Sequence, residues 1–83
     1  MTEPSRPLGT VGRAAWDANA DRVDAALLLT YCETLDEREI LRRQVLRGEA
    51  PAERRALRQL EARIDDLADS VARNRSWNTY EGV

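Results

Sequence analysis

The side chains of this sequence that could carry chemistry are nearly all arginines and carboxylates. The chain has no histidine and a single cysteine, Cys32, and it contains neither a glycine-rich phosphate loop nor a paired-cysteine motif. No imidazole is present to act as a general base, and an ordinary zinc site is nearly excluded. The sequence therefore predicts a protein that is not an enzyme and that uses no metal and no other cofactor.

Two weaker sites remain as minor alternatives. Asp65 or Asp66 can share a helix face with Asp69, which would allow a metal site, although a solvated acidic face is the favoured interpretation. Cys32 lies in an apolar stretch with no base available, so a buried small residue is favoured over a nucleophile.

The arginines are concentrated in the middle of the chain. All 13 basic residues are arginine, and seven of them lie between residues 38 and 58, against three glutamates. Arginine suits contacts with DNA phosphates, but helix faces solvated by local Glu–Arg pairs are the favoured interpretation for a monomer. The candidate DNA-binding residues are Arg38, Arg42, Arg43, Arg47, Arg54, Arg55 and Arg58.

Two amphipathic helices are predicted to position these arginines. Residues 51–73 place five branched aliphatic side chains at steps of 3, 4, 3 and 4, the spacing of a coiled-coil seam. So narrow a stripe needs a partner helix, and residues 22–47 supply one with a face broad enough to contact something else as well. The residues predicted to pack in the core or between subunits are Trp16, Leu28, Tyr31, Leu35, Leu57, Leu60, Ile64, Leu67 and Val71.

The connection between these two helices is short. Gly48 fits the left-handed position that ends a helix, and Pro51 fits the first turn of the next helix. Two long helices joined so closely run antiparallel, with the arginine-rich segment at their turn. The predicted fold is all-α: a short N-terminal helix and a long antiparallel helical hairpin, which assembles through helix packing into an oligomer.

A short helix is predicted over about residues 10–19, with Thr10 as its N-cap. Gly12 weakens this helix by roughly 1 kcal/mol relative to alanine. It therefore indicates either close packing against another helix or simply a residue of low helix propensity in a short helix. Trp16 is predicted to pack against the long helices, with base stacking as a minor alternative. Asp24 or the nearby Asp21 is predicted to cap the helix that follows.

The ends of the chain flank this helical region. Residues 1–7 are predicted to form a flexible arm, residues 8–73 the helical domain and residues 74–83 a C-terminal tail. Trp77 and Tyr80 are the two large aromatics of the tail. They are candidates for docking onto the hairpin, a neighbouring subunit or a partner, with disorder as an equal alternative.

The order of these features resembles a known family. The motif Leu8-Gly9-x-x-Gly12-x-x-x-Trp16 precedes the first long helix. That helix carries Asp24-x-x-Leu27-Leu28-x-x-Tyr31-Cys32-Glu33-x-x-Asp36-Glu37-Arg38, and the second long helix carries Glu53-Arg54-x-Ala56-Leu57. Over residues 8–72 the chain resembles the short small-terminase subunits of tailed bacteriophages, especially those that infect actinobacteria. Residues 70–77 stand where members of that family often have a Gly-Leu-x-Pro segment.

The resemblance implies a subunit that forms a ring of roughly eight or more copies, with the hairpin as the ring-forming element. Such rings recognise double-stranded viral DNA and regulate the large terminase subunit, which is the motor ATPase and nuclease of genome packaging. The basic residues of the hairpin would then be the DNA contacts, and the subunit itself would not be the enzyme.

The alternative is a non-enzymatic helical hairpin that serves as a virion component or scaffold and binds protein rather than DNA. The net charge of −2 and the aromatic tail favour this second hypothesis. The lone cysteine, the polar start of the chain and the lack of an apolar run near the roughly 20 residues of a membrane span predict an intracellular protein with no membrane association. Together with this prediction, the resemblance to phage proteins implies the bacterial host cytoplasm.

Overall fold

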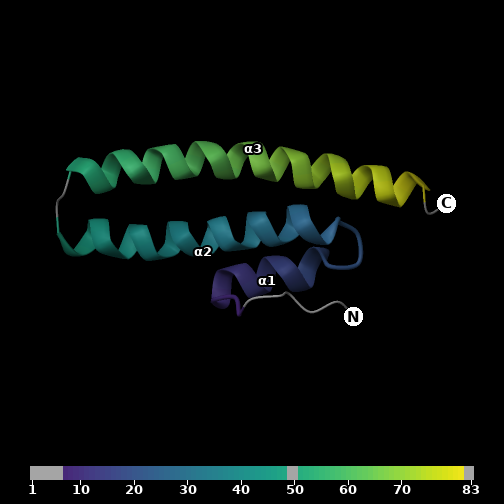
Figure 1. Cartoon of the computed structure of the whole chain (residues 1–83), viewed down its shortest axis with the longest axis horizontal. Coiled ribbons are helices and arrows are strands. Elements are labelled where there is room, and N and C mark those ends of the chain that lie inside the picture. Colours follow the sequence, from purple (N-terminus) through teal and green to yellow (C-terminus); the bar gives the residue numbers. More distant parts are fainter. Residues whose placement is uncertain (1–6, 49–50, 82–83) are drawn as a thin grey trace.

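A computed structural model describes residues 7–48 and 51–81 of the chain, with side chains as far as Trp77. This part of the chain is all-helical, as predicted, with three helices and no strand: α1 (Thr10–Asn19), α2 (Ala25–Arg47) and α3 (Pro51–Glu81). Figure 1 shows α2 and α3 side by side and pointing in opposite directions, with α1 folded back along α2 on the side away from α3. The helix α2 is therefore the middle layer of the molecule.

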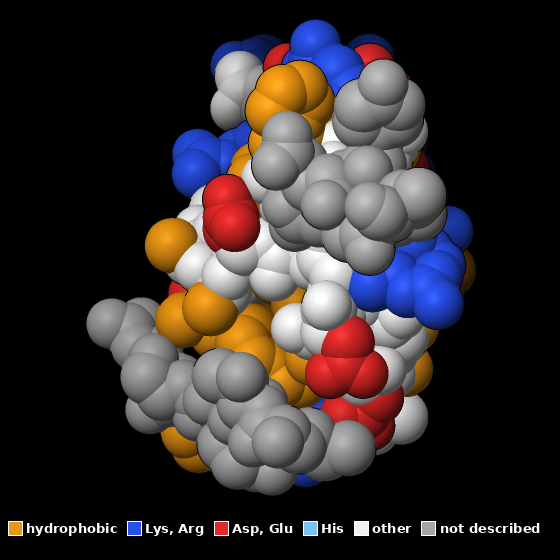
Figure 2. Space-filling view, turned by 90° about the vertical axis from the view of Figure 1, so that its right-hand side faces the viewer, with side chains coloured by type: hydrophobic (Ala, Val, Ile, Leu, Met, Phe, Trp, Pro, Cys, Tyr) orange, Lys and Arg blue, Asp and Glu red, His pale blue; other side chains and the backbone are white. Residues whose placement is uncertain are grey.

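The core lies in the half of the molecule that contains α1. Trp16 of α1 is 3% exposed and packs in one cluster with Val23, with Leu28 and Cys32 of α2 and with Val71 of α3. Figure 2 views the molecule from the α1–α2 connection and shows hydrophobic side chains in the middle of this end, with arginines and carboxylates around them. All three helices thus meet at one apolar cluster.

The predicted packing residues fall into two groups. Trp16, Leu28, Leu35, Ile64 and Val71 are buried, whereas Tyr31, Leu57, Leu60 and Leu67 are half-buried. Towards the α2–α3 connection only two helices are present, because α1 covers the other half of α2. The apolar stripe of α3 is therefore less completely covered near the turn.

The N-terminus of α1 is held by a carboxylate from α2. Asp36 accepts hydrogen bonds from the backbone N–H groups of Gly9 and Gly12, each at 2.8 Å. A Cβ atom at Gly12 would lie 2.8 Å from the carbonyl oxygen of Cys32 and closer still to the Asp36 carboxylate. No described glycine has positive φ, so Gly12 is required by the close approach of the helices and not by its backbone conformation.

The predicted helix caps need correction. Gly9, not Thr10, occupies the N-cap position of α1, and because glycine has no side chain the cap comes from α2. Asp24 is the N-cap residue of α2, which begins at Ala25 instead of about residue 22, but its side chain caps no backbone N–H of that helix. Its carboxylate accepts a hydrogen bond from the Asn74 amide instead, at 3.0 Å.

The predicted ends of the long helices also differ. Gly48 follows α2 with φ −159° and ψ 144°, an extended conformation instead of the left-handed one. The helix α3 runs to Glu81 instead of ending near residue 73, so most of the expected tail is helical. Asn74 lies inside this helix, where it also accepts a hydrogen bond from the Asp24 backbone N–H at 2.9 Å.

Candidate nucleic-acid interface at the α2–α3 turn

Six of the seven candidate DNA-binding arginines are exposed, and they lie on the helix ends that flank the α2–α3 connection. Three come from the last turns of α2 and three from the first turns of α3. Opposite helix directions bring the two groups to the same end of the molecule (Figure 1). The exposed residues are Arg42, Arg43, Arg47, Arg54, Arg55 and Arg58.

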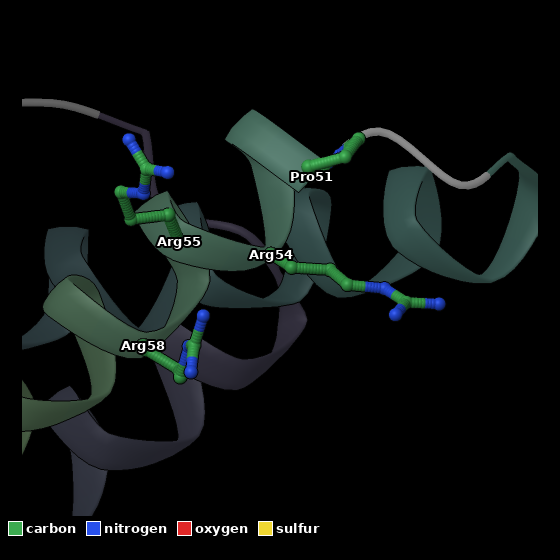
Figure 3. Close-up of a pocket in the computed structure, with 4 residues that line it drawn as sticks. All are labelled: Pro51, Arg54, Arg55 and Arg58. Carbon is green, nitrogen blue, oxygen red and sulfur yellow. The ribbon is translucent and has the colours of Figure 1, made fainter.

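The arginines of α3 surround a shallow hollow at the start of that helix. Arg54, Arg55 and Arg58 line it together with Pro51, and Figure 3 shows the three side chains extending in different directions from consecutive turns. Fanned guanidinium groups do not converge on one small anion, but they present positive charge over a surface. Phosphates spaced along a nucleic-acid backbone match that arrangement, and the N-terminal end of the helix dipole has the same sign.

The arginines of α2 have a different setting. Arg43 forms an i,i+4 ion pair with Glu39, with 3.8 Å between its Nε and a carboxylate oxygen, and such exposed pairs contribute only a few tenths of a kcal/mol. Arg42 and Arg43 border a second hollow whose apolar lining includes Leu46 and Leu57. This side of the turn therefore combines positive charge with exposed hydrophobic surface.

Arg38 is the exception among the predicted DNA contacts. It is half-buried, and its Nε atom is buried without a hydrogen-bond partner in the described part of the chain. A guanidinium in this position is less accessible to a phosphate than the exposed arginines of the turn. The structure therefore places Arg38 at the edge of the packed region, apart from the candidate interface.

The geometry does not support the alternative of a metal site at the aspartates of α3. Asp65, Asp66 and Asp69 are exposed, and the described residues contain no group of three or more Cys, Asp or Glu side chains that could hold a metal ion. The structure leaves these carboxylates as a charged face of α3.

Cys32 is buried, as predicted, with no exposed surface. Burial, together with the smaller effects of the negative charges of Asp36 and Glu33, raises the pKa of its thiol from 9.0 to about 11. The thiol is therefore protonated at neutral pH and shielded from reagents, which is the opposite of an activated nucleophile.

This shift predicts a loss of stability in alkaline solution. Because the folded pKa of Cys32 exceeds the unfolded pKa, stability is complete below about pH 9 and falls as pH rises through about 11, by at most about 2–3 kcal/mol. Urea unfolding between pH 8 and 11.5 measures this. The chain has no lysine, so few other side chains titrate in that window, and a Cys32→Ala variant is the matched control. An equal fall in both proteins would contradict the assignment.

The aromatic residues of the predicted tail are only partly described. Trp77 is 62% exposed on α3, and the side chain of Tyr80 lies outside the described residues. Sequence reasoning missed the contacts that hold this part of α3 to the α1–α2 connection. They include the Asp24–Asn74 pair and a hydrogen bond from Arg75 to the Asn19 side chain at 3.2 Å.

Comparison with known proteins adds no relative to this picture, because no family model, curated protein or solved structure matches the chain. Among the described helices, none is long and apolar enough to cross a membrane.

Proposed function

We propose that this chain is a non-enzymatic adaptor that binds double-stranded DNA and assembles into an oligomeric ring, in the manner of a small terminase subunit that regulates a large terminase motor. The observation that carries the proposal is the set of exposed arginines on both sides of the α2–α3 turn. A ring in which all turns point the same way would present these arginines as a basic rim.

The charge distribution supports this use of the turn. Residues 38–58 carry a formal charge of +4, whereas the remainder of the chain carries −6. The turn end is therefore basic although the net charge of the whole chain is negative. Several copies side by side would add their positive charges at this end. Electrostatic attraction to phosphate is long-ranged and additive, so a ring would bind DNA more strongly than a single subunit.

The limited core supports an oligomer. Leu46 is 86% exposed near the end of α2, and Ile40 is 59% exposed in a hollow beside the start of α1. A small domain completes its core most readily by association with further copies. A helical-hairpin scaffold that binds protein is the second candidate function, because the same exposed apolar residues could contact a partner of another kind.

Reversing charge at the start of α3 is expected to weaken DNA binding. Arg55→Glu combined with Arg58→Glu removes two phosphate contacts and adds repulsion, so affinity for a fluorescent duplex should fall on the order of tenfold or more. Fluorescence anisotropy over a salt series measures both the affinity and its salt dependence, whose slope should shrink by about two.

The control for this experiment makes the same change of net charge away from the turn. Arg13→Glu on α1 combined with Arg63→Glu on α3 alters exposed arginines outside the turn and should leave affinity within a few-fold of the wild type. Equal loss in both variants would show that only net charge matters. No DNA binding by the wild-type oligomer would favour the protein-binding scaffold.

A further inference from the structure

We propose that copies of this chain join head to tail, with the apolar hollow beside the α2–α3 turn of one copy receiving Trp77 of the next. The inference rests on the oligomer of the proposed function and names the contact that builds it. In this contact Arg42 and Arg43 of the first copy face the Asp66 and Asp69 carboxylates of the second.

The head of the contact is the hollow on the α2 side of the turn. Val45, Leu46 and Leu57 supply its apolar lining, and Glu39, Arg42 and Arg43 form its polar border. Leu46 is 86% exposed, so most of its surface is available to a partner. An apolar floor with a charged border is the usual composition of a protein–protein contact.

The second surface of the contact, which docks onto the hollow of the neighbouring copy, is the outer face of α3 near its C-terminal end. Trp77 is 62% exposed there, and Asp66 and Asp69 precede it by 11 and 8 residues, which places all three on one helix face together with Arg73. This face points away from the buried stripe that contains Ile64 and Val71. The axial distance from Asp69 to Trp77 is about 12 Å, so one neighbour can reach both.

The distribution of exposed hydrophobic residues favours opposite ends meeting. Of the large exposed hydrophobic residues in the described region, Leu46 lies near the turn, Trp77 lies near the other end of the molecule, and Ile40 lies beside the start of α1. A tryptophan that fills an apolar hollow at the centre of a contact is a common source of binding energy.

Charge favours a second copy of this chain as the occupant, and a head-to-tail contact over a head-to-head one. Two turn ends in contact would bring together segments of charge +4, whereas head-to-tail contact places a +4 segment against a face that carries Asp66 and Asp69 with one cation, Arg73. A head-to-tail contact uses two different surfaces, so it repeats from copy to copy and closes into a ring when the rotation allows.

This arrangement divides the arginines of the turn between two tasks. Arg42 and Arg43 border the hollow that receives the neighbour, while Arg54, Arg55 and Arg58 surround the separate hollow at the start of α3 (Figure 3). Subunit contact and DNA contact therefore use different arginines and can be tested separately.

The test uses two variants that each remove one half of the contact. Leu46→Asp places a carboxylate in the apolar hollow, and Trp77→Ala removes the side chain that fills it. Both residues are exposed, so both variants should keep the wild-type helical content, which circular dichroism checks. Native mass spectrometry should find each variant alone as a monomer, and an equimolar mixture as a dimer that cannot grow further.

The dimer in the mixture is the decisive result, because each variant retains the half that the other lacks. Gln44→Asp and Ser76→Ala change exposed neighbouring positions and should assemble like the wild type. A wild-type oligomer whose mass neither variant changes would overturn this contact and leave the proposed oligomer standing on another surface. Loss of assembly in Leu46→Asp but not in Trp77→Ala would overturn the head-to-tail arrangement, and a monomeric wild type would overturn both the contact and the ring.

Discussion

Replacement of Trp16 by alanine is expected to lower the free energy of unfolding by about 3–5 kcal/mol. The side chain is 3% exposed and is the contribution of α1 to the cluster that contains Leu28, Cys32 and Val71. Its removal leaves a cavity in the apolar cluster that joins the three helices. A domain of 83 residues has a total stability of roughly 4–12 kcal/mol, so the loss would leave little or no folded protein at 37 °C.

Urea unfolding followed by circular dichroism measures this effect without relying on the tryptophan that is removed. The second tryptophan supplies a matched control, because Trp77→Ala deletes the same side chain from an exposed position and should change monomer stability by less than about 0.5 kcal/mol. The comparison is made at a protein concentration where both variants are monomeric. Equal destabilisation by the two substitutions would contradict the assignment of Trp16 as the core anchor.

The helices and their main anchor could be predicted because they depend on local pattern. The 3–4 spacing of Ile64, Leu67 and Val71 indicates a helix and its buried side, and the structure buries Ile64 and Val71. A tryptophan in a short helix has few ways to remove its large surface from water other than packing on its neighbours. These conclusions require only the period of the helix and the size of the side chain.

The features that could not be predicted depend on residues far apart in the sequence. Asp24 pairs with Asn74 across 50 residues, and neither residue type identifies its partner. The same contact explains the wrong end of the last helix. The helix is predicted to end at residue 73, but the side chain of the next residue, Asn74, is used in tertiary contact, and no proline or glycine interrupts the helix before Gly82.

The candidate interface was likewise predictable only in part from the sequence. Its arginines could be assigned to the turn end from the hairpin alone, because a short connection places the end of one helix beside the start of the next. The burial and the ion-pair partner of each arginine could not be predicted, because Arg38 becomes half-buried and Arg43 pairs with Glu39 only once the helix faces are fixed. Packing thus decides which arginines of a basic segment remain available to a partner.

Loss of the Asp36 carboxylate is expected to have the next largest effect, because this group holds α1 onto α2. Gly9 and Gly12 donate to its two oxygens at 2.8 Å, and hydrogen bonds to a charged group contribute about 1.5–3 kcal/mol each. The helix α1 has no side-chain cap of its own, so its first N–H groups depend on this residue. Because the bond from Gly9 is exposed to solvent and the bond from Gly12 is only partly buried, Asp36→Ala should lower the free energy of unfolding by about 2–3 kcal/mol, less than the sum of the two. Glu37→Ala removes the same charge from an exposed neighbour and should lower it by less than about 0.5 kcal/mol.

The asparagine variant separates the carboxylate's chemistry from its shape. Asp36→Asn keeps the size of the side chain but replaces one acceptor oxygen with an N–H₂ group, which would then face a backbone N–H donor. It should lose most of the stability that Asp36→Ala loses, and hydrogen exchange at the Gly12 amide should become faster in both variants. If Asp36→Asn is as stable as the wild type, the residue acts by filling space. If it is destabilised, then a carboxylate on α2 and two glycines on α1 form one docking unit, which gives a physical reason for Gly9 and Gly12 three residues apart and for an aspartate 24 residues after Gly12.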